Sequence, residues 1–502
     1  MDKQAMDAKT FLDLYTWALF LSLLVALLFW LRIYYNKYAP HGPLPLPLIG
    51  TLYMHSIVPS GEEYAKLGKK YGGVFTLYAG SNRLIIVNDV DLISKVLKQS
   101  SFVNRGIAHS YPLKHLSYSI AIFRADYTKK LVENRKLVSS TLRILGVGKP
   151  AMDHKILLET NTVLSYFLEQ GCRPFNPNRI IHQAMLNSIL GMAFDTRLDY
   201  EDEDAKTFTD GLFRLNDNFL YNNMIGYIGV LRHIPPFKWY LKWYMDNNLV
   251  LINILDKYVN MCIERFKPGH TSCLMDIWVQ SHYDAKPDTI AEFDRKDVIA
   301  TVLDLIGAGI DSTAVAILWF LVYITNRPLL QERLYSEISG IIGTDRQVGL
   351  SDKEDLPLLQ ATILETNRFS SVAPFSIRQS DPTGDTVLSN YTIKKGTNVI
   401  VNIYNAHMDE NIWENPHEFN PERFLNEDGT KVVHKTQVIP FGAGKRMCIG
   451  DVLAKHEIFL LTSNFIQQCR FSLPEGTNQI SEDPEYGKFR CTKPFSIVTN
   501  AR

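Results

Sequence analysis

A stretch near the C-terminus places a cysteine in a loop of small residues, just before a helix-like segment. It reads Phe-Gly-Ala-Gly-Lys-Arg-Met-Cys-Ile-Gly over residues 441–450, and a helical pattern follows over 451–465. The dipole and unpaired N–H groups of a helix N-terminus stabilise a thiolate, here that of Cys448. The glycines let the backbone approach a large planar ligand, and Arg446 can pair with an anionic group. These are the parts needed to hold haem iron by a cysteine sulfur, an axial ligand that favours O–O cleavage.

The same stretch resembles the haem-binding signature of the cytochrome P-450 family, Phe-x-x-Gly-x-Arg-x-Cys-x-Gly, at every fixed position. The resemblance implies haem b (iron protoporphyrin IX) as cofactor and Cys448 as its iron ligand. It also implies that Arg446 binds a haem propionate and that Phe441 and Gly442 contact the cofactor. The alternative is an ordinary buried cysteine beside a glycine turn, which a full match to the signature makes improbable.

A second stretch with chemical content lies inside the long apolar segment 298–325. There the chain reads Gly-Ala-Gly-Ile-Asp-Ser-Thr over residues 307–313. A second membrane span is one interpretation, but charged residues and glycines at mid-span disfavour it. A buried helix that crosses a cofactor explains them better, because small residues leave room for a ligand and a carboxylate beside a hydroxyl can relay protons.

This second stretch resembles the oxygen-activation motif of the family, Ala/Gly-Gly-x-Asp/Glu-Thr-Thr/Ser. The resemblance implies that Asp311 and Ser312 deliver protons. Ser312 stands where the family usually has threonine, and its χ1 angle is less restricted than that of a β-branched residue. Thr313 is expected to serve as ordinary helix packing.

A pair of charged residues, Glu365 and Arg368, lies at i and i+3 and therefore on one helix face. Such pairs are common on surface helices. Here the pair resembles the Glu-x-x-Arg motif of the family, and the companion Pro-Glu-Arg-Phe follows at 421–424. The resemblance implies a structural triad of Glu365, Arg368 and Arg423 that supports the haem loop.

Further propionate ligands are expected at two arginines. Arg135, on a predicted basic amphipathic helix over 126–142, matches the arginine of the Trp-x-x-x-Arg pair of the family, but Leu131 occupies the tryptophan position. An exposed arginine on a helix face is the alternative. The segment 372–377 should run past the haem, which makes Arg378 a candidate ligand.

The remaining elements predict a mainly α fold with a small β-rich lobe. Apolar and β-branched runs at 74–78 and 83–87 indicate a hairpin, and Asp89 should cap a helix that ends near residue 97. Helices are expected over 180–194 and 249–266, and a second hairpin over 391–403. The segment 237–244 interleaves aromatic residues with two lysines, which suits either a membrane interface or a packed core.

An uncharged apolar run over 14–31 is long enough to span a bilayer as a helix. A cleaved signal peptide is the alternative, but the run lacks a small-x-small cleavage site. Arg32 and Lys37 follow it and predict a cytosolic body by the positive-inside rule. The expected organisation is an anchor (1–35), a Pro-rich hinge (36–50) and a haem-binding catalytic domain (51–502), single-pass in the endoplasmic reticulum membrane. In that orientation the sequon at Asn390 stays unmodified.

The composition limits the other possibilities. The 502 residues contain 53 basic and 53 acidic side chains and are 46% hydrophobic, which allows a large core, and no basic block points to nucleic acid. Six cysteines occur without CxxC pairs, and all but Cys448 are expected to be reduced cytosolic thiols. They are residues 172, 262, 273, 448, 469 and 491.

The resemblance as a whole, to microsomal animal members of the family, implies a haem-thiolate monooxygenase. Such an enzyme inserts one atom of O₂ into a hydrophobic substrate such as a sterol, fatty acid, terpenoid or xenobiotic. Its electrons come from NADPH through a membrane-bound reductase, and cytochrome b5 and the lipid bilayer are further expected partners. Two alternatives are an O₂-independent enzyme that rearranges or dehydrates peroxides, and a non-enzymatic haem carrier. The acid–alcohol pair Asp311–Ser312 speaks against the first.

Overall fold

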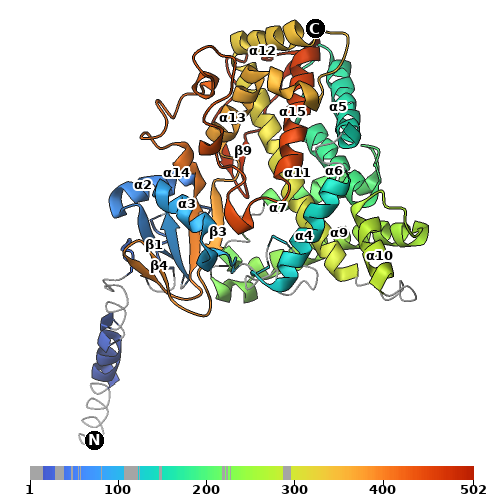
Figure 1. Cartoon of the computed structure of the whole chain (residues 1–502). Coiled ribbons are helices and arrows are strands. Elements are labelled where there is room, and N and C mark those ends of the chain that lie inside the picture. Colours follow the sequence, from blue (N-terminus) through green and yellow to red (C-terminus); the bar gives the residue numbers. More distant parts are fainter. Residues whose placement is uncertain are drawn as a thin grey trace, which may run out of the picture.

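The structure is a computed structural model that describes residues 15–25, 27–28, 39–46, 49–54, 56, 58–80, 82–106, 122–123, 125–145, 150–217, 221, 224–226, 228–285 and 295–502. Helices dominate it and strands form small sheets, as the sequence predicted (Figure 1). The labelled helices are α2 (Gly61–Tyr71), α3 (Val90–Lys98), α4 (Lys129–Ile144), α5 (Pro150–Gln170), α6 (Asn178–Phe194), α7 (Glu203–Asp217), α9 (Phe237–Arg265), α10 (Leu274–Ala285), α11 (Arg295–Thr325), α12 (Pro328–Ile341), α13 (Pro357–Ser370), α14 (Ile403–His407) and α15 (Asp451–Gln468). The strands are β1 (Val74–Ala79), β2 (Asn82–Val87), β3 (Phe375–Gln379), β4 (Thr386–Leu388), β5 (Tyr391–Ile393), β6 (Asn398–Asn402), β7 (Cys469–Ser472), β8 (Pro484–Tyr486), β9 (Arg490–Thr492) and β10 (Val498–Ala501).

The β-rich lobe is built on a sheet of strand order β1-β2-β6-β3. β1 and β2 form the predicted hairpin, and β2 pairs with β6 in parallel. Phe75 and Ile86 pack with Tyr64 of α2, while Ile85 packs with Ile93 of α3. Both faces of the sheet are therefore covered, and the lobe lies to one side of the helical body (Figure 1).

The predicted hairpin over 391–403 is wrong. β5 pairs with β4 across a turn at Ser389, whose φ of 54° lies in the left-handed region. β6 instead inserts between β2 and β3. The alternation of residues identified both strands correctly, but the pairing depends on how distant segments assemble into the sheet.

The helical body surrounds α11, which runs as one continuous helix through residues 307–313. α6, α13 and α15 pack against it. Among the described residues, α11 is the helix long and apolar enough to cross a membrane, but most of its apolar residues are buried inside the molecule. It is therefore a core helix, as the sequence indicated.

Side-chain caps set where several helices begin. Asp89 accepts the N–H of Leu92 at the start of α3, as predicted. Thr128 accepts the N–H of Leu131, so that α4 begins at residue 129 rather than at 126. α9 begins at residue 237, whereas the predicted helix began at residue 249. The segment 237–244 therefore forms the first turns of α9. In those turns Tyr240 is buried, whereas Trp239 is 67% exposed, so the segment is core on one face and surface on the other.

Residues 15–25 form a short apolar helix that stands apart from the body (Figure 1). Its large side chains are exposed, from Leu24 at 38% to Trp17 at 70%. Parts of the predicted anchor over 14–31, and both Arg32 and Lys37, lie outside the described residues.

Candidate functional site

Backbone hydrogen bonds and two glycines shape the loop that carries Cys448. The N–H of Cys448 donates to the carbonyl oxygen of Phe441 over 3.0 Å. Gly442 has a φ of 68°, which favours glycine, and open space lies where a Cβ would stand. At Gly444, with a φ of 72°, a Cβ would lie 2.3 Å from the carbonyl oxygen of Leu97 at the end of α3. The shape of the loop and its seat on α3 therefore both require glycine.

The Cys448 side chain is exposed and lies just before α15. The surrounding chain raises the pKa of its thiol by desolvation, and the carboxylate of Asp451 adds to this rise. The N–H of Gly450 and the positive charges of Arg135 and Lys455 lower the pKa. A metal cation at this sulfur would deprotonate it, because a coordinating thiol binds as the thiolate. An exposed sulfur supported by an N–H group and nearby cations is suited to bind iron.

Four arginines from separate segments lie close enough to act on one another: Arg105, Arg135 of α4, Arg378 of β3 and Arg446 of the Cys448 loop. The pKa of Arg378 is lowered to about 10 by desolvation and then by Arg446 and Arg135. The pKa of Arg446 is also lowered to about 10, by desolvation and then by Arg135. Desolvation, followed by the other arginines of this group, lowers the pKa of Arg105 well below its usual value. Positive charge thus accumulates beside the Cys448 loop.

Two of these arginines have donors that lack acceptors. Arg378 is 1% exposed, and its Nη1 donates to the carbonyl oxygen of Ile377 over 3.3 Å. Its Nη2 and the Nε of Arg105 are buried without a partner among the described residues. Leaving buried donors of a charged group unpaired is costly. A cofactor with two carboxylates would supply the missing acceptors and charge, so these residues fit haem with its propionates.

The other two arginines tie segments together. Arg446 donates to the carbonyl oxygens of Val103 and Ala125 over 2.7 and 2.6 Å. Arg135 donates to the carbonyl oxygen of Met447 over 2.7 Å. Both guanidiniums thus hold the Cys448 loop against its neighbours. Both also act on Arg378, so their positive charge is available to attract an anion.

Two further sequence-predicted positions lie in the same region. Leu131 is 1% exposed and lies one turn before Arg135 on α4, so no side-chain donor stands where the family pattern has tryptophan. Phe441 lies beside α15, with the Nζ of Lys455 5.0 Å from the centre of its ring. This contact joins the start of the Cys448 loop to the helix that follows it.

Asp311 and Ser312 of α11 have different partners. Asp311 is 1% exposed, and its Oδ2 lies 3.2 Å from the Nζ of Lys488, in the turn between β8 and β9. Its Oδ1 lies 3.9 Å from the Nε2 of His182 on α6, a histidine whose pKa is lowered by burial. The Ser312 hydroxyl donates to the carbonyl oxygen of Ala308 over 2.6 Å. The carboxylate is therefore held by cationic or titratable groups, and the hydroxyl by its own helix.

Glu365, Arg368 and Arg423 meet in the interior. The Nε and Nη2 of Arg368 donate to the Glu365 carboxylate over 2.7 and 2.8 Å, and the Nε of Arg423 donates over 3.3 Å. The side chains of Glu365 and Arg368 are 0% exposed, and that of Arg423 is 9% exposed. The N–H of Asn420 completes the set at 2.8 Å. A carboxylate shared by two guanidiniums is a strong and directional arrangement.

His407 connects this triad to the Cys448 loop. Its Nε2 accepts the N–H of Ile439 over 3.0 Å, just before the loop. Its Nδ1 bonds the Ser371 hydroxyl over 2.8 Å, which donates in turn to the carbonyl oxygen of Arg368. Desolvation, and then the charges of Arg368 and a second arginine, lower the pKa of His407 to about 3. The imidazole is therefore neutral, with its proton on Nδ1.

Sequence reasoning missed Arg105 and His407. Arg105 follows an isolated bridge between Asn104 and Gln379, which brings it beside Arg378 only in the folded chain. The neighbouring residues gave no motif that marks it. His407 ends α14, and a lone histidine after an apolar segment carries no signal that separates a buried acceptor from a surface side chain. Both roles depend on contacts between segments that are distant in sequence.

Comparisons with known proteins agree with this geometry. The family model described as Cytochrome P450 matches residues 40–498. Cytochrome P450 2U1 of Bos taurus is 31% identical over 519 residues, which cover 97% of this chain and 94% of that relative. Cytochrome P450 1A1 of Canis lupus familiaris is 31% identical over 465 residues, which cover 89% of this chain and 87% of that relative. The matched region contains the Cys448 loop, α11 and the triad.

Proposed function

Because the chain belongs to the cytochrome P450 family and is a monooxygenase with microsomal animal relatives, we propose that Cys448 is the thiolate ligand of its haem iron. Haem bound in this way supplies the oxygen-activating chemistry, which an axial thiolate favours. The observation that carries the proposal is the group of arginines beside the Cys448 loop, in which the Nη2 of the buried Arg378 has no acceptor among the described residues. Such a site suits a planar, dianionic cofactor.

In this proposal Arg378, Arg446 and Arg135 bind the haem carboxylates, and Arg105 contributes further positive charge. Phe441 and Gly442 flank the cofactor. The support for the first three is that the charges of Arg446 and Arg135 lower the pKa of Arg378, and the charge of Arg135 lowers the pKa of Arg446. Binding of a dianion would relieve that repulsion, so the cofactor and the arginines should stabilise each other.

Asp311 and Ser312 are proposed to move protons to the oxygen-binding side of α11. Asp311 is buried, and Lys488 and His182 lie within 3.2 and 3.9 Å of its carboxylate, so it can exchange a proton with titratable neighbours. The Ser312 hydroxyl would have to turn away from the carbonyl oxygen of Ala308 to take part. Serine can do so because its χ1 angle is less restricted than that of threonine.

The triad of Glu365, Arg368 and Arg423 is proposed to hold the Cys448 loop in shape through His407. The support is the chain of hydrogen bonds from Arg368 through Ser371 and His407 to the N–H of Ile439. These residues do not touch a reacting atom in this account. They act by fixing where Cys448 lies.

The substrate is proposed to be a hydrophobic small molecule, such as a sterol, fatty acid, terpenoid or xenobiotic, that approaches α11. The N–H groups of Ile122 and Phe123 both donate to Asp304 of α11 over 2.9 Å, which places an apolar segment against this helix. Phe123 is 45% exposed. Apolar side chains held beside the helix that carries Asp311 favour a substrate with little charge.

Electrons are proposed to come from NADPH through a membrane-bound reductase, with cytochrome b5 as a second donor. In this proposal residues 1–35 anchor the chain as a single span in the endoplasmic reticulum membrane. The Pro-rich residues 36–50 then join this anchor to a cytosolic catalytic domain, residues 51–502. The apolar helix Tyr15–Val25 supports the assignment of an anchor, because its large apolar side chains are exposed and a lipid bilayer would cover them.

The experiment that tests this function uses the full chain in phospholipid vesicles with an NADPH-dependent reductase. A panel of sterols, fatty acids and terpenoids is added in turn, and NADPH and O₂ consumption are followed together with oxygenated product. We expect at least one compound to raise NADPH consumption and to yield a product that carries one atom from labelled O₂. Product formation from organic peroxides without NADPH or O₂ would contradict the proposal and favour a peroxide-rearranging enzyme.

A further inference from the structure

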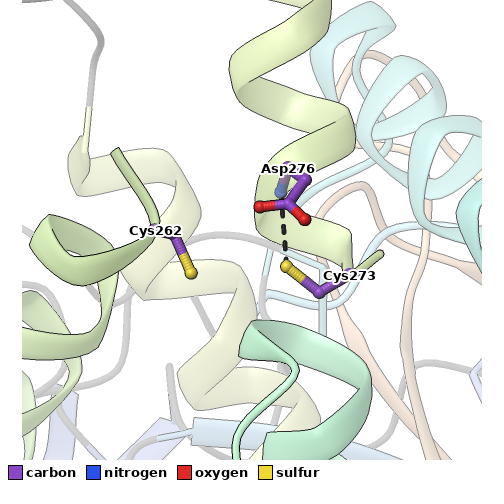
Figure 2. Close-up of side chains that lie close together, drawn as sticks. All are labelled: Cys262, Cys273 and Asp276. Atoms are coloured by element: carbon purple, nitrogen blue, oxygen red, sulfur yellow. Dashed lines mark hydrogen bonds between the residues drawn. The ribbon is translucent and has the colours of Figure 1, made fainter. Parts of the chain in front are cut away.

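A second cluster of metal-binding side chains lies away from the Cys448 loop, where α9 meets α10. Cys262 comes from the last turns of α9, Cys273 directly precedes α10, and Asp276 lies in its first turn. Figure 2 shows the two sulfur atoms facing each other, with the Asp276 carboxylate beside Cys273. The ligand atoms of the three residues lie within 4.8 Å of one another. Their exposures are 2%, 0% and 4%, so the cluster is buried.

Hydrogen bonds already orient these groups. The Cys273 sulfur accepts the N–H of Asp276 over 3.4 Å and the Nη2 of Arg265 over 3.5 Å. One oxygen of Asp276 accepts both the N–H and the hydroxyl of Ser272, over 3.0 and 2.8 Å. Donors of this kind fix the direction of metal ligands and tune their basicity.

We propose that Cys262, Cys273 and Asp276 bind a zinc ion that ties the end of α9 to the start of α10. Two thiolates and a carboxylate carry three negative charges. Zinc contributes two positive charges and the guanidinium of Arg265, 3.8 Å from Asp276, contributes a third. The buried group is therefore neutral with the metal in place, which avoids the cost of an uncompensated buried charge.

The ligand set favours zinc over other common cations and over a disulfide. Thiolates select zinc, whereas magnesium and calcium prefer oxygen ligands. Zinc–sulfur bonds of about 2.3 Å leave tetrahedral ligand atoms roughly 3.8 Å apart, so the cluster needs to contract little. A disulfide bond of about 2.0 Å would need a larger movement and would leave Asp276 without a role.

Metal binding would displace the weak bond from the Cys262 thiol to the carbonyl oxygen of Phe194, at 3.8 Å. That carbonyl keeps the Nη2 of Arg265 at 2.7 Å, so it stays paired. The Arg265 side chain, which balances the charge of the cluster, is 41% exposed. Three protein ligands leave a fourth position for a water molecule.

The test measures zinc in the haem-loaded full chain after dialysis against a zinc buffer. Cys262→Ser and Cys273→Ser are compared with Cys469→Ser, which removes a buried thiol outside the cluster. We expect about one zinc per chain in the wild type and in Cys469→Ser, and less than about a tenth of that in the other two. Asp276→Asn should weaken zinc binding by about tenfold or more. The thiolate Soret band of the reduced carbon-monoxide complex serves as the check of folding in each variant.

A second measurement needs no variant. Cadmium added to the folded wild-type chain should produce a sulfur-to-cadmium charge-transfer band, and this band should disappear when the chain unfolds. Zinc that is absent from the wild type, or equal in all variants, would overturn the proposal. So would recovery of a Cys262–Cys273 disulfide from the unreduced protein.

Discussion

Protonation of His407 should destabilise the protein at acidic pH, because the folded structure requires the neutral imidazole. The Nε2 of His407 accepts the N–H of Ile439, and a proton on that nitrogen would oppose this donor. The pKa of His407 is about 3 in the folded protein, whereas an unfolded histidine titrates near 6.5. Since the folded pKa is the lower one, the unfolded state binds more protons between these values. The stability that the neutral His407 contributes is therefore fully present above about pH 6.5, and it is lost as the pH falls toward 3.

The magnitude follows from the two pKa values. A pH of about 5 lies some 1.5 units below the pKa of the unfolded histidine, so that histidine is mostly protonated, whereas His407 in the folded protein is still neutral. With about 1.4 kcal/mol per unit, His407 alone should lower the free energy of unfolding by about 2 kcal/mol between roughly pH 7.5 and pH 5. Groups such as Glu457, whose pKa is raised to about 7 by burial, also titrate in this range, so a comparison with a variant is needed.

The assay is chemical denaturation at both pH values, followed by tryptophan fluorescence, for the wild type, His407→Gln and His270→Gln. The glutamine carbonyl at 407 can accept the N–H of Ile439 but does not titrate. His407→Gln should therefore lose about 2 kcal/mol less than the wild type on acidification. His270 is exposed, and its variant should behave as the wild type. Equal acid sensitivity in His407→Gln and the wild type would refute the reasoning.

Two further predictions concern the site, and one concerns the membrane orientation. Ser312→Ala should bind haem and substrate but release peroxide, with product per NADPH reduced by about 10², whereas Ser312→Thr should keep its coupling; unchanged coupling in the alanine variant would make Ser312 a packing residue. Arg378→Met should stabilise the apoprotein, since it removes a buried charge among other arginines, yet weaken haem retention by roughly 10- to 100-fold. Thermal melting of the apoprotein measures the first effect, and haem transfer to apomyoglobin measures the second. Unchanged haem retention would contradict the assignment of Arg378. Protease added outside intact microsomes should degrade the body, and a glycan on the exposed Asn390 would show that the orientation is inverted.

The parts of the fold and site that the sequence predicted are those set by local patterns. The Cys448 loop, the pair of Glu365 and Arg368, and the cap at Asp89 each depend on a few neighbouring residues, and all were found. α11 could be recognised as a core helix because charged residues and glycines interrupt its apolar surface.

The parts that could not be predicted depend on contacts between distant segments. The local pattern predicted that β5 and β6 form one hairpin, but β6 lies between β2 and β3 and pairs with both of them. No local pattern encodes that pairing. Arg105 joins the arginine group only through the bridge from its neighbour Asn104 to β3. The cysteines 262 and 273 lack the CxxC spacing of a metal site, and they meet because α9 and α10 pack together.

The central claim is that Cys448 is the iron ligand. The most direct measurement is the absorption spectrum of the reduced, carbon-monoxide-bound protein, for the wild type and for Cys448→Ser. The account predicts a red-shifted thiolate Soret band in the wild type that is lost in Cys448→Ser and kept in Cys469→Ser. Persistence of that band in Cys448→Ser would show that another residue holds the iron.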